Sequence, residues 1–124
     1  QLRPNIHIAD MAESYIKVLE VDKDKVAGKI FNVGYENQSV RELAEIVREV
    51  IGEDITLIAT PTDDNRSYHI SSERIRHELD FEAKRTIREA VKDLRDALDG
   101  GKLPNSLEDE RYFNIRRMQS IQLT

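Results

Sequence analysis

Apolar residues recur at helical intervals in several segments of this chain. Over residues 9–21 the spacings are one, three and four residues, which predicts a helix with one apolar stripe formed by Met11, Ala12, Tyr15, Ile16 and Leu19. A second helix is expected over residues 40–51, where "VRELAEIVREVI" carries the same periodicity.

Capping signals mark where the later helices begin and end. Ser39 with Glu42 predicts a capping box ahead of the helix over 40–51, and Gly52 is expected in the left-handed conformation after it. Thr86 with Glu89 predicts a second capping box, opening a helix over 87–101 that the final glycine pair closes. A shorter helix is expected over 72–81, capped by one of the serines at positions 71 and 72.

Four short segments have strand-like composition: residues 5–8, 28–34, 54–61 and 66–70. Because they alternate with helices, the fold class is predicted to be α/β or α+β, with a small, mainly parallel sheet and flanking helices. We divide the chain into a main domain over residues 1–101 and an arm or tail over 102–124, where the periodicity is weak.

Composition narrows the function classes. The formal net charge of −5 argues against a nonspecific nucleic-acid binder, which needs clustered Lys and Arg. No apolar run approaches the roughly 20 residues of a membrane helix, so no membrane partner is expected. The absence of cysteine fits a reducing compartment, and we expect a cytoplasmic location. The chain starts at Gln1, just before a strand-like segment, as a piece of a longer protein would.

Two arginines are candidates for anion binding. Arg66 lies between a strand-like segment and a helix start, and its planar guanidinium can bind phosphate or carboxylate oxygens in pairs. The simpler interpretation is a weak surface ion pair with Asp63 or Asp64. Arg3, taken alone, is typical of a surface residue.

His7 and Asp10 stand at the first strand-to-helix junction. Asp10 can cap the helix and His7 can hydrogen-bond nearby backbone. As a metal pair they lack a third and a fourth ligand nearby, so we interpret both as structural residues.

Four segments in order resemble one family. "QLRPNIHIADMAESY" (1–15), "GKIFNVGYENQSVRELAEIV" (28–47), "DDNRSYHISSERIRHELDF" (63–81) and "TIREAVKDLRDAL" (86–98) are similar to the extended short-chain dehydrogenase/reductases. These are the NAD(P)-dependent nucleotide-sugar epimerases and dehydratases. The resemblance covers roughly residues 1–100 and implies the C-terminal, substrate-binding portion of a Rossmann-type epimerase fold.

The resemblance also implies a ligand. Gln1, Arg3 and Arg66 would bind the diphosphate of a nucleotide sugar, and the parent enzyme would use NAD or NADP. This chain has neither the glycine-rich turn nor the Tyr-x-x-x-Lys pair of that family, so alone it is expected to bind no cofactor and to be inactive. It also carries Asp80 where the family usually has glycine.

Two other interpretations stay open. The chain could be a stand-alone binding or interaction module that reuses this half-fold without catalysis, or a protein whose arginines are only surface charges. If the chain is a fragment, removal from the rest of the fold leaves unpaired strand edges and apolar faces, which predict a homo-oligomer, most simply a two-fold dimer; a compact monomer would favour the stand-alone module.

Overall fold

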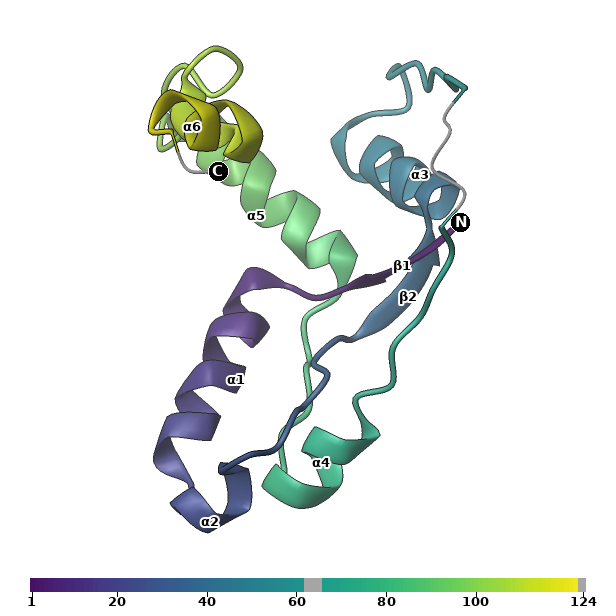
Figure 1. Ribbon diagram of the computed structural model, residues 1–124. Coiled ribbons are helices and arrows are strands. Elements are labelled where there is room, and N and C mark those ends of the chain that lie inside the picture. Colours follow the sequence, from purple (N-terminus) through teal and green to yellow (C-terminus); the bar gives the residue numbers. More distant parts are fainter. Residues whose placement is uncertain (62–65, 123–124) are drawn as a thin grey trace. The chain divides into compact units, whose positions relative to one another are not determined.

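A short antiparallel pair of strands joins the start of the chain to the residues just before its second long helix. The structure is a computed structural model that describes residues 1–61 and 66–122. Strand β1 (Leu2–Asn5) pairs with β2 (Glu36–Ser39), with Leu2 opposite Ser39 and Asn5 opposite Glu36 (Figure 1). The fold is therefore of mixed α+β type, and the predicted mainly parallel sheet is wrong.

The sheet also uses other residues than predicted. β1 ends at Asn5, so the strand expected over 5–8 lies three residues earlier, and the polar segment that forms β2 had no strand-like pattern. Of the segments 28–34, 54–61 and 66–70, the parts that the structure describes form no strand. Apolar composition alone does not make a strand, because a strand also needs a neighbouring backbone edge to pair with.

Two of these segments are held by side-chain hydrogen bonds rather than by the backbone hydrogen bonds of a β-ladder. The Asn37 amide donates to the Ile70 carbonyl over 3.2 Å and accepts from the Ile70 N–H over 3.0 Å, as a strand neighbour would. The Ser72 hydroxyl likewise lies 2.8 Å from both the N–H and the carbonyl oxygen of Gly34. A Cβ added at Gly34 would lie 2.8 Å from Ile70 Cδ1, so the two segments approach closely at this glycine.

The three long helices form within two residues of where periodicity and capping signals predicted them: α1 (Ile8–Glu20), α3 (Val40–Ile51) and α5 (Ile87–Asp99). Both capping boxes are confirmed, around Ser39 and around Thr86. Gly101 is left-handed with φ +66°, as a helix-ending glycine should be. Gly52 is not left-handed, because its φ of 160° is extended. One further short helix, α2 (Lys23–Val26), lies between α1 and β2.

The buried apolar core forms around the short helix α4 (Glu73–Leu79). Ile75, Leu79 and Phe81 are buried there, and the half-buried hydrophobic residues that pack against them are Val18, Val21, Val26, Phe31 and Val33. The hydroxyl of Ser72 bonds Gly34 rather than the helix, and the Ser71 hydroxyl accepts the N–H of Glu73 at 3.3 Å. α4 ends at Asp80, which is left-handed with φ 51°.

The chain forms two compact units, residues 1–93 and the residues from Leu94 on. The second unit contains the end of α5, a 3-10 turn η1 (Glu110–Tyr112) and helix α6 (Asn114–Ser120), so the expected tail has helical structure of its own. The predicted boundary between residues 101 and 102 stays a prediction. In the described ranges, no helix has both the length and the apolar composition to cross a membrane.

Candidate functional site

The structure brings Arg3 against the backbone of Arg66, although 63 residues separate them in sequence. Nη1 of Arg3 donates to the carbonyl oxygen of Arg66 and to that of Leu2, the latter over 3.0 Å. The Arg3 guanidinium also lies over the ring of Tyr68, 5.6 Å from its centroid. Arg66 itself is exposed.

Two hydrogen bonds fix the segment of Arg66 beside β1. The Leu2 N–H donates to the Ser67 hydroxyl over 2.9 Å, and the Tyr68 N–H donates to the Leu2 carbonyl over 3.3 Å. Asp63 and Asp64, the alternative ion partners of Arg66, lie outside the described residues. The two arginines therefore leave neighbouring stretches of backbone.

Gln1 lines a cavity at the same end of β1, and its carbonyl oxygen accepts the N–H of Val40 at 3.3 Å. The cavity has a volume of about 620 Å³ and lies between the first turns of α3 and residues 57–60. Its lining residues are Gln1, Val40, Arg41, Ala44, Glu45, Leu57, Ile58, Ala59 and Thr60. A mostly apolar wall with a few polar groups is typical of small-molecule sites.

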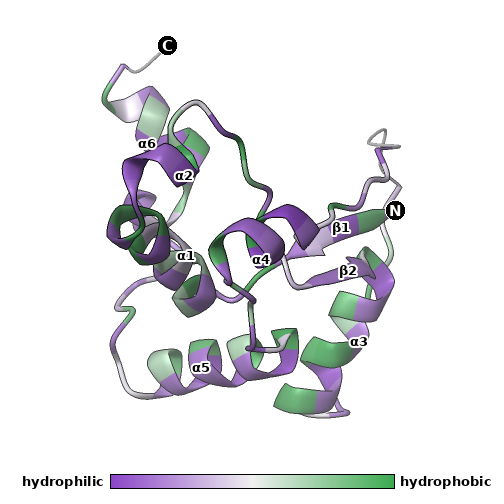
Figure 2. Ribbon diagram, turned by 90° about the horizontal axis from the view of Figure 1, so that it is seen from below, coloured by the Kyte–Doolittle hydropathy of each residue, from purple (hydrophilic) through white to green (hydrophobic). Residues whose placement is uncertain are grey.

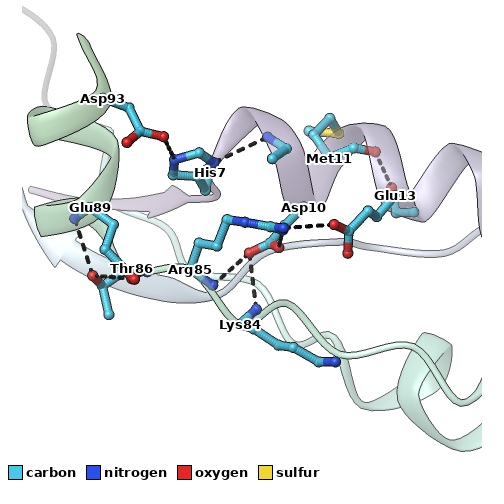
Figure 3. A network of polar contacts seen from close by, with 11 residues as sticks. His7, Asp10, Met11, Glu13, Lys84, Arg85, Thr86, Glu89 and Asp93 are labelled. Atoms are coloured by element: carbon cyan, nitrogen blue, oxygen red, sulfur yellow. Dashed lines mark hydrogen bonds and ion pairs between the residues drawn. The ribbon is translucent and has the colours of Figure 1, made fainter. Parts of the chain in front are cut away.

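Asp10 is the most buried charged side chain among the described residues, with 1% exposure. It sits in the first turn of α1 and accepts the backbone N–H groups of Lys84 at 2.9 Å and Arg85 at 2.8 Å, together with Nη1 of Arg85 (Figure 3). Arg85 also donates to Glu13 over 2.8 Å. Burial raises the pKa of Asp10, but these hydrogen bonds and the Arg85 charge outweigh it, and the pKa is lowered.

His7, rather than Asp10, is the cap of α1. Its Nδ1 accepts the N–H of Ala9 at 3.1 Å, and its Nε2 lies 3.2 Å from Oδ2 of Asp93 (Figure 3). These two partners fit a neutral ring that is protonated on Nε2. His7 and Asp10 thus contact residues 86 and 75 positions away in the sequence, and the structural role expected for both stays a prediction.

Sequence reasoning missed the distant partners in this network. Arg85 and Asp93 belong to an ordinary charged stretch before and within α5, and no spacing rule links them to residues 7–10. No sequence signal predicted the burial of Asp10 either, because an acid in the first turn of a helix is also favourable on the surface. Within residues 1–61 and 66–122, no group of three or more metal-ligating side chains could hold an ion.

Comparisons with known proteins identify no relative of this chain. No family model matches the chain, and no curated protein or solved structure matches it significantly.

Proposed function

We propose that this chain is the C-terminal, substrate-binding portion of an NAD(P)-dependent nucleotide-sugar epimerase or dehydratase. In this proposal Gln1, Arg3 and Arg66 bind the diphosphate of the nucleotide sugar. The observation that carries it is the contact of the Arg3 guanidinium with the Arg66 carbonyl, because it joins the two arginines that the family resemblance selects.

The geometry supports an anion site of this kind on physical grounds. Each guanidinium offers up to five N–H donors in a fixed plane, which match phosphate oxygens in pairs. Arg3 is half-buried and held by two carbonyls and by Tyr68, so it loses little side-chain entropy when an anion binds.

The neighbouring cavity supplies a place for the rest of such a ligand. Leu57, Ile58 and Val40 give it apolar walls, while Gln1 and Arg41 bring polar groups to its edge. A nucleoside needs both surfaces, since its base stacks on apolar groups and its ribose hydroxyls hydrogen-bond. The proposal includes the finer fold expected from sequence, in which this chain completes a Rossmann-type enzyme whose other half carries the cofactor and the catalytic pair.

The proposal is tested by calorimetric titration of the chain with UDP-glucose, dTDP-glucose, GDP-mannose and inorganic pyrophosphate. For any of these ligands that the wild-type chain binds, Arg66→Ala should weaken the binding free energy by about 1.5–3 kcal/mol, the value of a charge-assisted hydrogen bond. Arg66→Lys should recover only part of that loss, because an ammonium cannot reproduce the planar fork.

Arg88→Ala is the matched control, because Arg88 is an exposed arginine paired with Glu49 and should leave affinity unchanged. The same titration with NAD⁺ should give no heat of binding, since the phosphate-cradling glycine turn is absent from the sequence. Equal affinity of the wild-type chain and Arg66→Ala would refute the site. So would the absence of binding for all three nucleotide sugars.

A further inference from the structure

Two side chains of opposite charge line the cavity beside α3. Arg41 and Glu45 stand four residues apart on this helix, so they lie on one face of it, one turn apart. Arg41 is exposed and Glu45 is half-buried. Figure 2 shows hydrophobic and hydrophilic residues on the successive turns of α3. The wall of the cavity therefore combines apolar side chains with one hydrogen-bond donor group and one acceptor group.

Both charges are unpaired among the described residues. In that part of the chain, the side chains of Arg41 and Glu45 form no hydrogen bond or ion pair, with each other or with a third group. Their order along the helix, with the cation first, is the less favourable one for an ion pair at this spacing. One turn further along α3, by contrast, Glu49 pairs with Arg88. A ligand in the cavity can therefore use both groups without breaking an existing contact.

The nucleotide bases differ in how they match such a pair. An ionised carboxylate only accepts hydrogen bonds, and its two oxygens fit two neighbouring N–H groups. Guanine has these groups side by side, N1–H and the N2 amino group, and its O6 and N7 accept hydrogen bonds from a guanidinium. In uracil and thymine a single N3–H lies between two carbonyl oxygens, which a carboxylate repels. In adenine and cytosine the amino group lies beside a ring nitrogen that has a lone pair instead of a hydrogen.

We propose that this cavity selects guanine, so that the ligand of the proposed site is a guanosine diphosphate sugar. Glu45 accepts N1–H and the N2 amino group, Arg41 donates to O6 or N7, and Val40 contacts the face of the base. The cavity volume of about 620 Å³ lies within the roughly 300–1,000 Å³ of small-molecule sites, so it has room for the nucleoside. The inference rests on the proposed function for the diphosphate, whereas the choice of base depends on the two charged residues of α3.

Mononucleotides test the choice of base apart from the diphosphate. In an NMR titration of the isotope-labelled chain, GMP should shift the backbone resonances of residues 40–45. It should bind about tenfold or more tightly than UMP, AMP and CMP, which is the discrimination expected of a good bidentate contact to a base. Calorimetry should likewise show tighter binding of GDP-mannose than of UDP-glucose and dTDP-glucose.

Glu45→Gln tests the residue that carries the selection. An amide has one acceptor and one donor group, so it cannot accept both N–H groups of guanine. The variant should bind GMP about tenfold more weakly and should not lose affinity for UMP. Glu49→Gln is the matched control, because Glu49 lies on the same helix but outside the lining of the cavity. It should leave the affinity for GMP unchanged, and circular dichroism of both variants should match that of the wild type.

Failure of the base selection and failure of the proposed function give different results. Equal affinity for GMP and UMP, or equal effects of Glu45→Gln and Glu49→Gln, would overturn the selection of guanine, while Arg66→Ala would still decide the diphosphate site. A preference for GMP together with an Arg66→Ala variant that binds GDP-mannose as tightly as the wild type would support the selection of guanine and refute the diphosphate site. A chain that binds no mononucleotide and no nucleotide sugar would overturn both.

Discussion

Replacing Asp10 by Asn should remove the ion pair between Asp10 of α1 and Arg85 in the segment before α5. The substitution keeps the shape of the side chain and one oxygen for the N–H groups of Lys84 and Arg85. It replaces the oxygen that accepts Nη1 of Arg85 with an NH₂ group, so two donors then face each other. The negative charge that balances Arg85 is also lost.

The magnitude follows from burial of the acid and exposure of its partner. A hydrogen bond to a charged group contributes about 1.5–3 kcal/mol, and loss of a wholly buried ion pair costs about 3–5 kcal/mol. Arg85 is 37% exposed and keeps Glu13, so the loss should lie near the lower figure. We expect Asp10→Asn to reduce the free energy of unfolding by about 2 kcal/mol. Asp10→Ala should cost about 4 kcal/mol, because two backbone N–H groups also lose their acceptor.

Urea denaturation followed by circular dichroism measures both variants at pH 7. The control is Asp93→Asn, because Asp93 is 71% exposed in its contact with His7 and should cost under about 1 kcal/mol.

The pH dependence gives a second check. The pKa of Asp10 is lower in the folded state, so its contribution is complete above its ordinary pKa of 3.8 and is lost as the pH falls through the folded value. The gap between wild type and Asp10→Asn should therefore narrow below pH 4. A variant within about 0.5 kcal/mol of wild type, with a gap that stays constant in acid, would refute the reasoning.

Two further substitutions follow from local geometry. Asp80→Gly should stabilise the chain by about 0.5–1 kcal/mol in urea denaturation, because Asp80 is left-handed at the end of α4, whereas Asp80→Ala should destabilise it; equal effects would contradict this. In the second unit, the hydrogen bonds from Arg111 lower the pKa of Asp109 to about 2, so its stabilising contribution is lost only as the pH falls toward that value. Arg111→Ala should raise this pKa toward 3.8, which an NMR titration of the Asp109 carboxyl measures; an unmoved titration curve would exclude Arg111 as the cause.

Helices were predictable from sequence because their signals are local. The box of Ser39 and Glu42 satisfies two backbone N–H groups within four residues, so both its partners are visible in the sequence. The helix after Thr86 was found for the same reason. The exposure of Ile8, Tyr15 and Leu19 on α1 could not be predicted, since periodicity shows that a helix has an apolar face but not where that face points.

The strands were not predictable, because pairing is a relation between distant segments. β2 consists of Glu, Asn, Gln and Ser, residues that seldom favour strands, and it forms because its backbone meets β1. Residues 28–34 have the right composition, but Gly34 meets the hydroxyl of Ser72 instead of a strand. The same limit applies to the candidate site, where Arg3 and Arg66 were named from the resemblance while their contact depends on the fold.

A few separate hydrogen bonds join the segment of Arg66 to β1 in the part of the chain that the structure describes. Its segment joins β1 through the Ser67 hydroxyl, the Tyr68 N–H and the Arg3 side chain, not through a continuous ladder. Each bond of this kind involves a single pair of groups, so the segment can open locally at a lower cost than a strand within a sheet. An anion that binds both guanidinium groups would add a further link between β1 and the Arg66 segment. If Arg3 and Arg66 bind the ligand as proposed, ligand affinity and local order at residues 66–68 would be coupled, and a weakened Leu2–Ser67 contact should reduce both together.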